Sequence, residues 1–225
     1  SEMANKYKLI ILSDEIYSEL SFNDKYESIS NFCPEKTIIS TGLSKWCGAG
    51  GWRLGYFIIP KNLKIIKDAL NVLASETFSA VSAPIQYAAI QAYDGDHKDY
   101  INSSKKILKA VGNYVYENLN SNTVLINKPQ GGFYLMPEFI SAKFSSSSKM
   151  CNDILEKTGV ALLPGLDFGF DKKRMLARLS FTDFDGKNFM NEYKKNNNIN
   201  DETIKKLAPK IVKGVDKLKK WSESI

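Results

Sequence analysis

Apolar residues in the first sixty positions gather in short continuous runs rather than at the spacing of an amphipathic helix. Runs of this length, bounded by polar or glycine-rich segments, are typical of strands that are buried on both faces of a parallel sheet. We predict three strands, at residues 7–12, 37–41 and 54–59. The segment between the last two, residues 42–53, is rich in glycine and too irregular for a strand or a helix.

From residue 61 onwards the apolar positions recur at helical spacing. We predict helices at residues 61–73, 84–93 and 96–118, the second of them with Pro84 in its first turn. Strands followed by amphipathic helices indicate an α/β domain. The third helix is long, and the polar residues 120–122 end its pattern, so we place a domain boundary near residue 120.

Beyond this boundary, short strand candidates are interspersed with helices. The strands are expected at residues 124–126, 132–136, 160–163 and 175–181, and the helices at residues 149–158 and 204–221. The serines at 145–148 can cap the first of these helices, and Gly159 is expected to end it. Residues 194–200 form a polar, low-complexity stretch that we interpret as a loop or insertion. The chain is therefore divided into a partial large α/β domain at residues 1–120 and a small α+β domain at residues 121–225.

Charge and composition exclude several classes of function. The net charge of +6 comes mostly from lysines spread along the chain, without a nucleic-acid-binding motif, so we expect solvated lysine faces and no nucleic-acid partner. No apolar run approaches the roughly 20 residues of a membrane span, and no signal peptide opens the chain, which predicts a cytoplasmic protein. A single histidine and three cysteines without a CxxC pair argue against a metal site or a Ser-His-Asp triad.

The motif SDEIY places Asp14 directly after the first predicted strand and Tyr17 three residues later. Ligand sites in open α/β sheets gather beyond the carboxyl ends of the strands, so an acid at this position is well placed for binding. The alternative is a turn or capping residue, which is the commoner role of an aspartate at the end of a strand.

The motif SKWCGAGGWRLGY holds Lys45 in the glycine-rich loop and Arg53 eight residues later. Lys45 is bracketed by tryptophan, cysteine and glycine, and an environment poor in charge favours the neutral, nucleophilic amine that forms imines. Glycines allow the backbone to approach a ligand closely. Cys47 has no base partner, so we interpret it as a packing residue.

The motif RLSFTDFDG places Arg178 inside an apolar strand. A buried guanidinium needs a partner. The partner is either an internal acid such as Asp183 or the carboxylate of a substrate. Arginine occurs only three times in the chain, at positions 53, 174 and 178, which gives weight to each placement.

Together these motifs resemble class I/II aminotransferases, the fold-type I enzymes that depend on pyridoxal 5'-phosphate (PLP). The similarity extends to the segments SAPIQYAAIQA, PQGGFY and PGLDFG. It implies the C-terminal half of a PLP-dependent transferase large domain, a mostly parallel sheet with helices, followed by a small α+β C-terminal domain. It also implies an aminotransferase that moves an amino group between an L-amino acid and a 2-oxo acid.

The resemblance assigns a role to each motif residue. Lys45 carries the cofactor as a Schiff base, an aldimine, and moves the proton between substrate and cofactor. Asp14 pairs with the pyridine nitrogen, and Tyr17 donates a hydrogen bond to the phenolic oxygen of the cofactor. Arg53 holds the phosphate, with Ser44 as a helper. Arg178 holds the α-carboxylate of the substrate.

Two departures from the family pattern matter. Gly42 stands where many relatives carry a serine that contacts the phosphate, so that contact is absent or passes to another hydroxyl. Family members are also roughly twice as long, and their first half supplies further cofactor contacts. We therefore expect an incomplete part of an enzyme, poorly active or inactive on its own, that belongs to a homodimer in its full-length form.

Two alternatives remain open from the sequence. The same lysine and electron-accepting ring serve PLP-dependent lyases and decarboxylases. An inactive fragment that acts only as a dimerisation or binding module is the other alternative, although the intact set of motif residues argues against it.

Overall fold

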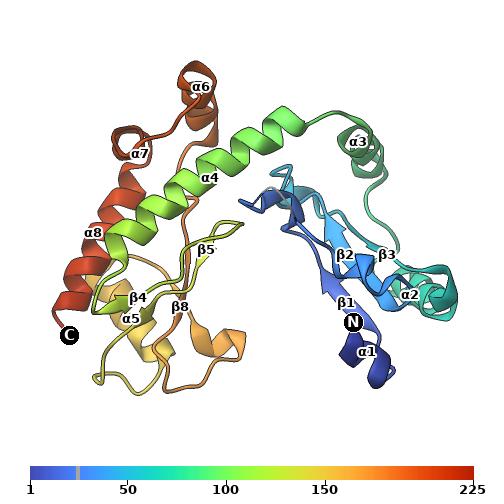
Figure 1. Ribbon diagram of the computed structural model, residues 1–225, viewed down its shortest axis with the longest axis horizontal. Helices are drawn as coiled ribbons and strands as arrows, with labels where there is room; N and C mark the ends of the chain where they lie inside the picture. Colours follow the sequence, from blue (N-terminus) through green and yellow to red (C-terminus); the bar gives the residue numbers. More distant parts are fainter. Residues whose placement is uncertain (24–25) are drawn as a thin grey trace. The chain divides into compact units, whose positions relative to one another are not determined.

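The computed structural model describes residues 1–23 and 26–225, and it divides into two compact units, Ser1–Ile101 and Asn102–Ile225. Figure 1 shows the two units joined through the long helix α4 (Lys98–Leu119), within which the division falls. The division lies before the boundary predicted near residue 120, because the apolar face of α4 packs into the core of the second unit.

The first unit is built around a three-stranded sheet in the order β1-β2-β3, formed by β1 (Ile11–Asp14), β2 (Thr37–Gly42) and β3 (Gly55–Ile58). β1 and β2 are parallel, as predicted, whereas β2 and β3 are antiparallel. A mostly parallel sheet was expected, and β3 is an antiparallel strand beside the parallel pair of β1 and β2. A parallel pair needs a crossover, usually a helix, and the glycine-rich loop between β2 and β3 contains only one short 3₁₀ turn.

Two helices of the first unit form where the apolar pattern predicts them. α2 (Lys64–Thr77) and α3 (Ala83–Asp94) correspond to the predicted helices, and Pro84 lies in the first turn of α3. The short helix α1 (Glu2–Lys6) was not predicted, and the strand after it begins at Ile11 rather than at residue 7. The sheet is thinly covered, since all four residues of β3 are exposed.

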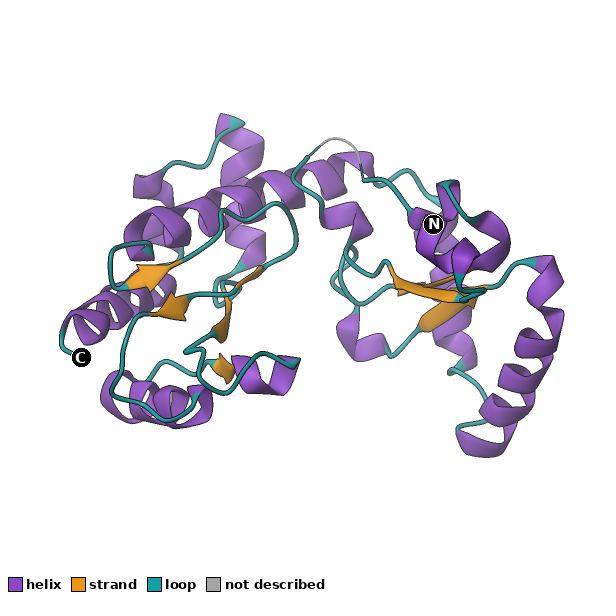
Figure 2. Cartoon of the chain, turned by 60° about the horizontal axis from the view of Figure 1, so that its bottom comes forward, coloured by secondary structure: helices purple, strands orange, loops and turns teal. Residues whose placement is uncertain are grey.

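The second unit combines helices with two small sheets, as Figure 2 shows by secondary structure. One sheet pairs β4 (Val124–Leu125) with β6 (Glu138–Phe139), and the other has the order β5-β8-β7, with β5 (Tyr134–Leu135), β7 (Leu163–Pro164) and β8 (Ala177–Ser180). The helices are α5 (Ser147–Thr158), α6 (Gly186–Asn196), α7 (Asp201–Leu207) and α8 (Pro209–Glu223).

The ends of the helices explain where the predictions hold. The Ser146 side chain accepts a hydrogen bond from the Lys149 amide at the start of α5, and Gly159 ends this helix in the left-handed conformation, as predicted. The single helix predicted at residues 204–221 is two helices, because Pro209 cannot continue α7 and instead begins α8. The loop predicted at residues 194–200 is helical up to Asn196.

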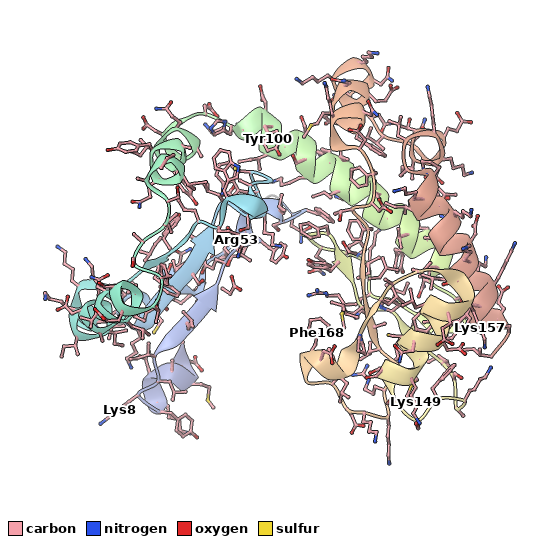
Figure 3. The ribbon with its side chains drawn as sticks, turned by 180° about the vertical axis from the view of Figure 1, so that it is seen from behind. Lys8, Arg53, Tyr100, Lys149, Lys157 and Phe168 are labelled. Atoms are coloured by element: carbon pink, nitrogen blue, oxygen red, sulfur yellow. The ribbon has the colours of Figure 1, made fainter. Side chains whose placement is uncertain are left out.

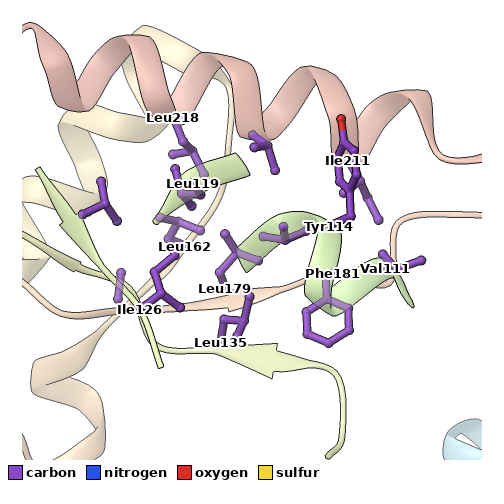
Figure 4. Close-up of a cluster of buried hydrophobic side chains, with 14 of the residues drawn as sticks. Val111, Tyr114, Leu119, Ile126, Leu135, Leu162, Leu179, Phe181, Ile211 and Leu218 are labelled. Carbon is purple, nitrogen blue, oxygen red and sulfur yellow. The ribbon is translucent and has the colours of Figure 1, made fainter. Parts of the chain in front are cut away.

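The second unit holds the larger hydrophobic core. Figure 4 shows α8, which carries Ile211 and Leu218, packed over side chains from α4 and from the strands. Phe181 is fully buried, and it lies so close to Gly112 of α4 that a Cβ at this glycine would be 2.9 Å from the phenyl ring. The core of the first unit is a small cluster of Leu43, Trp46, Ala49 and Ala89.

Candidate active site

Strand register brings five of the predicted site residues to one edge of the sheet in the first unit. Asp14, the last residue of β1, is paired with Ser40, and Gly42 at the end of β2 is paired with Gly55 at the start of β3. The carboxyl ends of β1 and β2 and the amino end of β3 therefore meet at the same edge. The residues that this edge carries are Asp14, Tyr17, Ser44, Lys45 and Arg53.

Lys45 and Tyr17 are in direct contact. The Lys45 Nζ atom lies over the Tyr17 ring, 5.5 Å from its centroid. An aromatic face at this distance attracts an ammonium group and limits its orientations. Tyr17 is held by the 3₁₀ turn Ser18–Leu20, whose last residue, Leu20, is only 2% exposed. Two motifs that are distant in the sequence thus form one constellation.

The loop that carries Lys45 is anchored on both sides of the lysine. Leu43 is fully buried before it, and Trp46 is 8% exposed after it. The Trp46 ring packs against Tyr93 and His97, with centroid distances of 5.8 and 6.0 Å. Lys45 itself is half-buried. Its buried neighbours therefore anchor the backbone on both sides of the lysine.

Gly42 is required by the approach of two backbone segments. A Cβ at this position would lie 2.5 Å from the Leu54 carbonyl oxygen and 2.9 Å from the Gly55 Cα. Real Cβ atoms essentially never come this close to backbone. A serine side chain therefore has no room at position 42, and Ser44 is the hydroxyl nearest to Lys45 in the sequence that can serve an anion at this edge.

Arg53 closes the same loop in a strained conformation. Its φ angle of 56° places it in the left-handed region, at the end of the 3₁₀ turn Gly50–Trp52. The guanidinium Nη1 atom donates a hydrogen bond of 2.6 Å to the Gly50 carbonyl oxygen. Arg53 is exposed, so its other N–H groups are accessible to an anion. Figure 3 labels this side chain in the first unit.

Asp14 performs the local role that its position at a strand end predicted, but only with one oxygen. Its Oδ1 atom accepts a hydrogen bond of 3.2 Å from the Ile16 amide. Within the described part of the chain, no hydrogen bond is made by Oδ2. Asp14 is exposed, so it can hold this turn and still accept a hydrogen bond from a ligand.

Glu15, the next residue, was not singled out from the sequence. Its side chain is buried, with 7% exposure, and accepts hydrogen bonds from the hydroxyls of Ser13 and Ser28. The only signal in the sequence is a second acid beside Asp14, and this signal does not reveal burial.

Arg178 lies on β8 in the second unit, between two aromatic rings. Its Cζ atom is 4.4 Å from the centroid of Tyr134 and 4.6 Å from that of Phe168. The internal partner considered for it, Asp183, instead pairs with Lys210 at 3.3 Å. Among the described residues, no carboxylate forms an ion pair with Arg178. Aromatic rings that stack on a guanidinium leave its in-plane N–H groups available for a planar anion.

Cys47 is not an activated thiol. Burial raises the pKa of its thiol, and a hydrogen bond with the backbone of Ala49 offsets this only in part. A nucleophilic cysteine needs a lowered pKa. Cys47 also packs against the small core of the first unit, which agrees with its interpretation as a packing residue.

Over residues 1–23 and 26–225, no group of three or more histidine, cysteine or acidic side chains could hold a metal ion. None of the helices in this part of the chain has the length and apolar content needed to cross a membrane.

The donor set at the edge of the first unit suits the cofactor that the motifs imply. PLP has an aldehyde, a phosphate, a pyridine nitrogen and a phenolic oxygen. The edge carries an amine, an exposed guanidinium, an exposed carboxylate and a phenol, one for each of these groups, and a serine hydroxyl besides. The residues therefore fit PLP by chemical type.

Comparisons with known proteins identify the family to which the chain belongs. The family model "Aminotransferase class I and II" matches residues 1–188. A probable N-acetyl-LL-diaminopimelate aminotransferase of Bacillus subtilis is 36% identical over 160 residues, which cover 71% of this chain and 39% of the relative. An aspartate aminotransferase of Geobacillus stearothermophilus is 35% identical over 177 residues, covering 75% and 44%.

Solved structures show the same similarity. The alanine aminotransferase of Pyrococcus furiosus has a TM-score of 0.78 and 26% identity, and the match covers 100% of this chain and 52% of that one. The aspartate aminotransferase of Thermotoga maritima has a TM-score of 0.72, also at 26% identity, with 98% and 49% covered. The chain thus spans about half of the length of the proteins it matches or less. It belongs to the class I and II aminotransferases, a family of PLP-dependent enzymes.

Proposed function

We propose that this chain forms part of an aminotransferase that moves an amino group between an L-amino acid and a 2-oxo acid. The observation that supports the proposal most directly is the contact of the Lys45 amine with Tyr17, at the edge that also carries Asp14 and Arg53. An amine can bind an aldehyde, an acid can bind a ring nitrogen, and a guanidinium can bind a phosphate. All three groups lie at this one edge.

In this proposal, the residues of the first unit bind and orient the cofactor. Arg53 neutralises the phosphate, and the Ser44 hydroxyl donates a hydrogen bond to it. The Asp14 carboxylate accepts the pyridinium N–H and keeps that nitrogen protonated. Tyr17 donates its hydroxyl proton in a hydrogen bond to the phenolic oxygen. When bound, PLP supplies the carbon that takes the amino group and a ring that accepts the electron pair left at the substrate Cα.

Lys45 has two tasks in the proposed reaction. Its amine is the group that would hold the cofactor at its aldehyde carbon until the amino group of the substrate takes its place there. Once free, the same amine would take up the proton from the substrate Cα and hold it for return to the cofactor side. The Tyr17 ring, against which the amine lies, limits the positions that Nζ can adopt during this transfer.

Arg178 is proposed to bind the α-carboxylate of the substrate. The rings of Tyr134 and Phe168 pack against its guanidinium, which can offer two parallel N–H groups to the two carboxylate oxygens. This explains why an arginine is placed in an apolar strand without an acidic partner among the described residues.

The remainder of the enzyme is also part of the proposal. We propose that the chain corresponds to the C-terminal part of the family fold, that the complete enzyme is a cytoplasmic homodimer, and that residues 77–82 approach the site of the neighbouring subunit. The matched relatives are about twice as long, and every residue of β3 is exposed, which supports a sheet that further polypeptide covers. Alone, the chain is expected to bind PLP weakly.

Borohydride trapping tests the proposal. The chain is mixed with PLP, reduced and mapped by peptide mass spectrometry, with Lys45→Ala and the matched exposed-lysine variant Lys61→Ala beside it. We expect labelling at Lys45 in the wild type, and the same labelling at Lys45 in Lys61→Ala. If labelling is scattered over all lysines both here and in a full-length form, the enzyme proposal is refuted. Stoichiometric conversion of PLP to its amine form by an amino acid then separates a transaminase from a lyase or a decarboxylase.

A further inference from the structure

Glu15 is a buried acid at the centre of a hydroxyl network beside the proposed site. Its Oε1 atom accepts hydrogen bonds of 2.6 Å from the Ser28 hydroxyl and 3.1 Å from the Ser13 hydroxyl. The Ser28 hydroxyl is also within 2.8 Å of Ser30 Oγ and accepts a bond from the Ser30 amide. Taking a carboxylate out of water is costly unless donors surround it, so a network of this kind calls for an explanation.

Tyr26 provides a second observation of the same network. The pKa of its phenol is raised, mainly by burial and further by the charge of Glu15 and by a hydrogen bond with it. Residues 26–30 therefore contribute a phenol and two hydroxyls around one acid that belongs to the SDEIY motif. Thirteen residues separate Glu15 from Ser28, so this contact holds together two segments that secondary structure does not connect.

The backbone of Glu15 continues the link towards the site. Its amide donates a 2.8 Å hydrogen bond to the Ser40 carbonyl on β2, and its own carbonyl accepts one of 3.0 Å from the Ser18 amide. The second bond closes the turn that contains Tyr17, and Asp14 lies directly before Glu15. Movement of Glu15 would therefore displace both residues that are proposed to bind the cofactor ring.

We propose that Glu15 is a positioning residue of the active site, whose buried carboxylate, held by Ser13, Ser28 and Tyr26, fixes the turn that presents Asp14 and Tyr17 to Lys45. The inference rests on the proposed function and extends it to a residue that touches neither cofactor nor substrate. Glu15 acts through the backbone, so its loss changes how the site binds and tunes PLP rather than removing a reacting group.

Four variants of the full chain test the proposal. Glu15→Ala removes the acceptor, Glu15→Gln keeps its shape and one acceptor oxygen, and Ser28→Ala removes the shortest hydrogen bond. Glu19→Gln is the matched control, because Glu19 is an exposed acid in the same segment. Borohydride labelling at Lys45 and the pH midpoint of absorbance of the bound cofactor are measured, together with hydrogen exchange of residues 13–20 without PLP.

The expected result is a loss of PLP affinity at Lys45 of about tenfold in Glu15→Ala, the scale of one hydrogen bond to a charged group. Glu15→Gln should lose less PLP affinity than Glu15→Ala, and Ser28→Ala should also lose affinity. Glu19→Gln should have the PLP affinity of the wild type. The absorbance midpoint should shift in the first three variants, since Tyr17 no longer holds its hydrogen bond to the phenolic oxygen.

The outcomes separate this inference from the proposed function. Unselective labelling of the wild type, both in this chain and in a full-length form, contradicts the proposed function. Hydrogen exchange without PLP tests the role of Glu15 independently of that outcome. Faster exchange of the Ser18 and Leu20 amides in Glu15→Ala, but not in Glu19→Gln, supports the positioning role. The positioning role is overturned if Glu15→Ala matches the wild type in labelling at Lys45, in the absorbance midpoint and in hydrogen exchange.

Discussion

Gly42→Ala should destabilise the first unit far more than an ordinary glycine-to-alanine change. The added methyl group would lie 2.5 Å from the Leu54 carbonyl oxygen, which is the acceptor of a 3.3 Å hydrogen bond from the Leu43 amide. Ordinary contact requires a separation of about 3.4 Å or more, so the two backbone segments must move apart by most of an ångström. This movement acts directly on the residues that precede Lys45.

The magnitude follows from two contributions. Forced displacement in a packed region costs about 1–3 kcal/mol, and the loss of the Leu43–Leu54 hydrogen bond adds about 1 kcal/mol. We therefore expect the free energy of unfolding to fall by about 2–4 kcal/mol. Gly42→Ser carries the same Cβ and should behave alike, even though serine supplies the hydroxyl that many relatives have at this position.

Gly51→Ala is the control, because a Cβ at Gly51 meets no atom within 4 Å and its φ angle is ordinary. It should be neutral or stabilising by up to about 1 kcal/mol. Tryptophans occur in both units, so urea unfolding by fluorescence is combined with hydrogen exchange resolved to β2 and β3. Gly42→Ala stability within about 0.5 kcal/mol of the wild type would show that the loop yields easily, and would refute the steric argument.

Three further predictions concern other parts of the chain. Two hydrogen bonds from Arg174 lower the pKa of the Glu138 carboxyl below its ordinary value of 4.5. The ionised pair therefore stabilises the fold above pH 4.5, and this stabilisation is lost as the pH falls through the lowered pKa. Arg174→Gln should therefore lower the urea midpoint at pH 7, and a difference of equal size at about pH 3 would contradict this. Trp221→Ala should cost about 3–5 kcal/mol in urea unfolding, because its ring is 4% exposed and packs edge-on against Phe139; Trp221→Phe should cost less. Cys47 should react with iodoacetamide more slowly than free cysteine, since burial raises its pKa, and unfolding in urea should abolish the difference.

Strand positions and the shared edge were predictable because each depends on local pattern alone. Short apolar runs indicate strands even where the strands are exposed. The rule that sites lie beyond strand ends brings Asp14 and Lys45 together without any knowledge of side-chain contacts. The start and end of α5 followed from a capping serine and a terminal glycine. These features need only a few neighbouring residues.

Features that depend on distant partners were not predictable. Arg178 meets Tyr134 because β5 pairs with β8 in one register, Tyr134 with Ser180, and no periodicity in the sequence reveals that pairing. The partner of Glu15 lies thirteen residues away in an irregular segment. The antiparallel direction of β3 depends on how the glycine loop folds back, which apolar patterning does not encode. The break at Pro209 was visible in the sequence and is a missed signal.

The left-handed backbone of Arg53 has a consequence for directed evolution. A residue with a Cβ pays on the order of 1 kcal/mol to adopt this conformation, whereas glycine adopts it freely. A library selected only for thermal stability should therefore enrich Arg53→Gly. The recovered variants would be more stable but would have an impaired anion site. A library sorted for retention of PLP should keep the arginine. The residue found at position 53 would thus indicate whether a population was selected for thermal stability or for PLP binding.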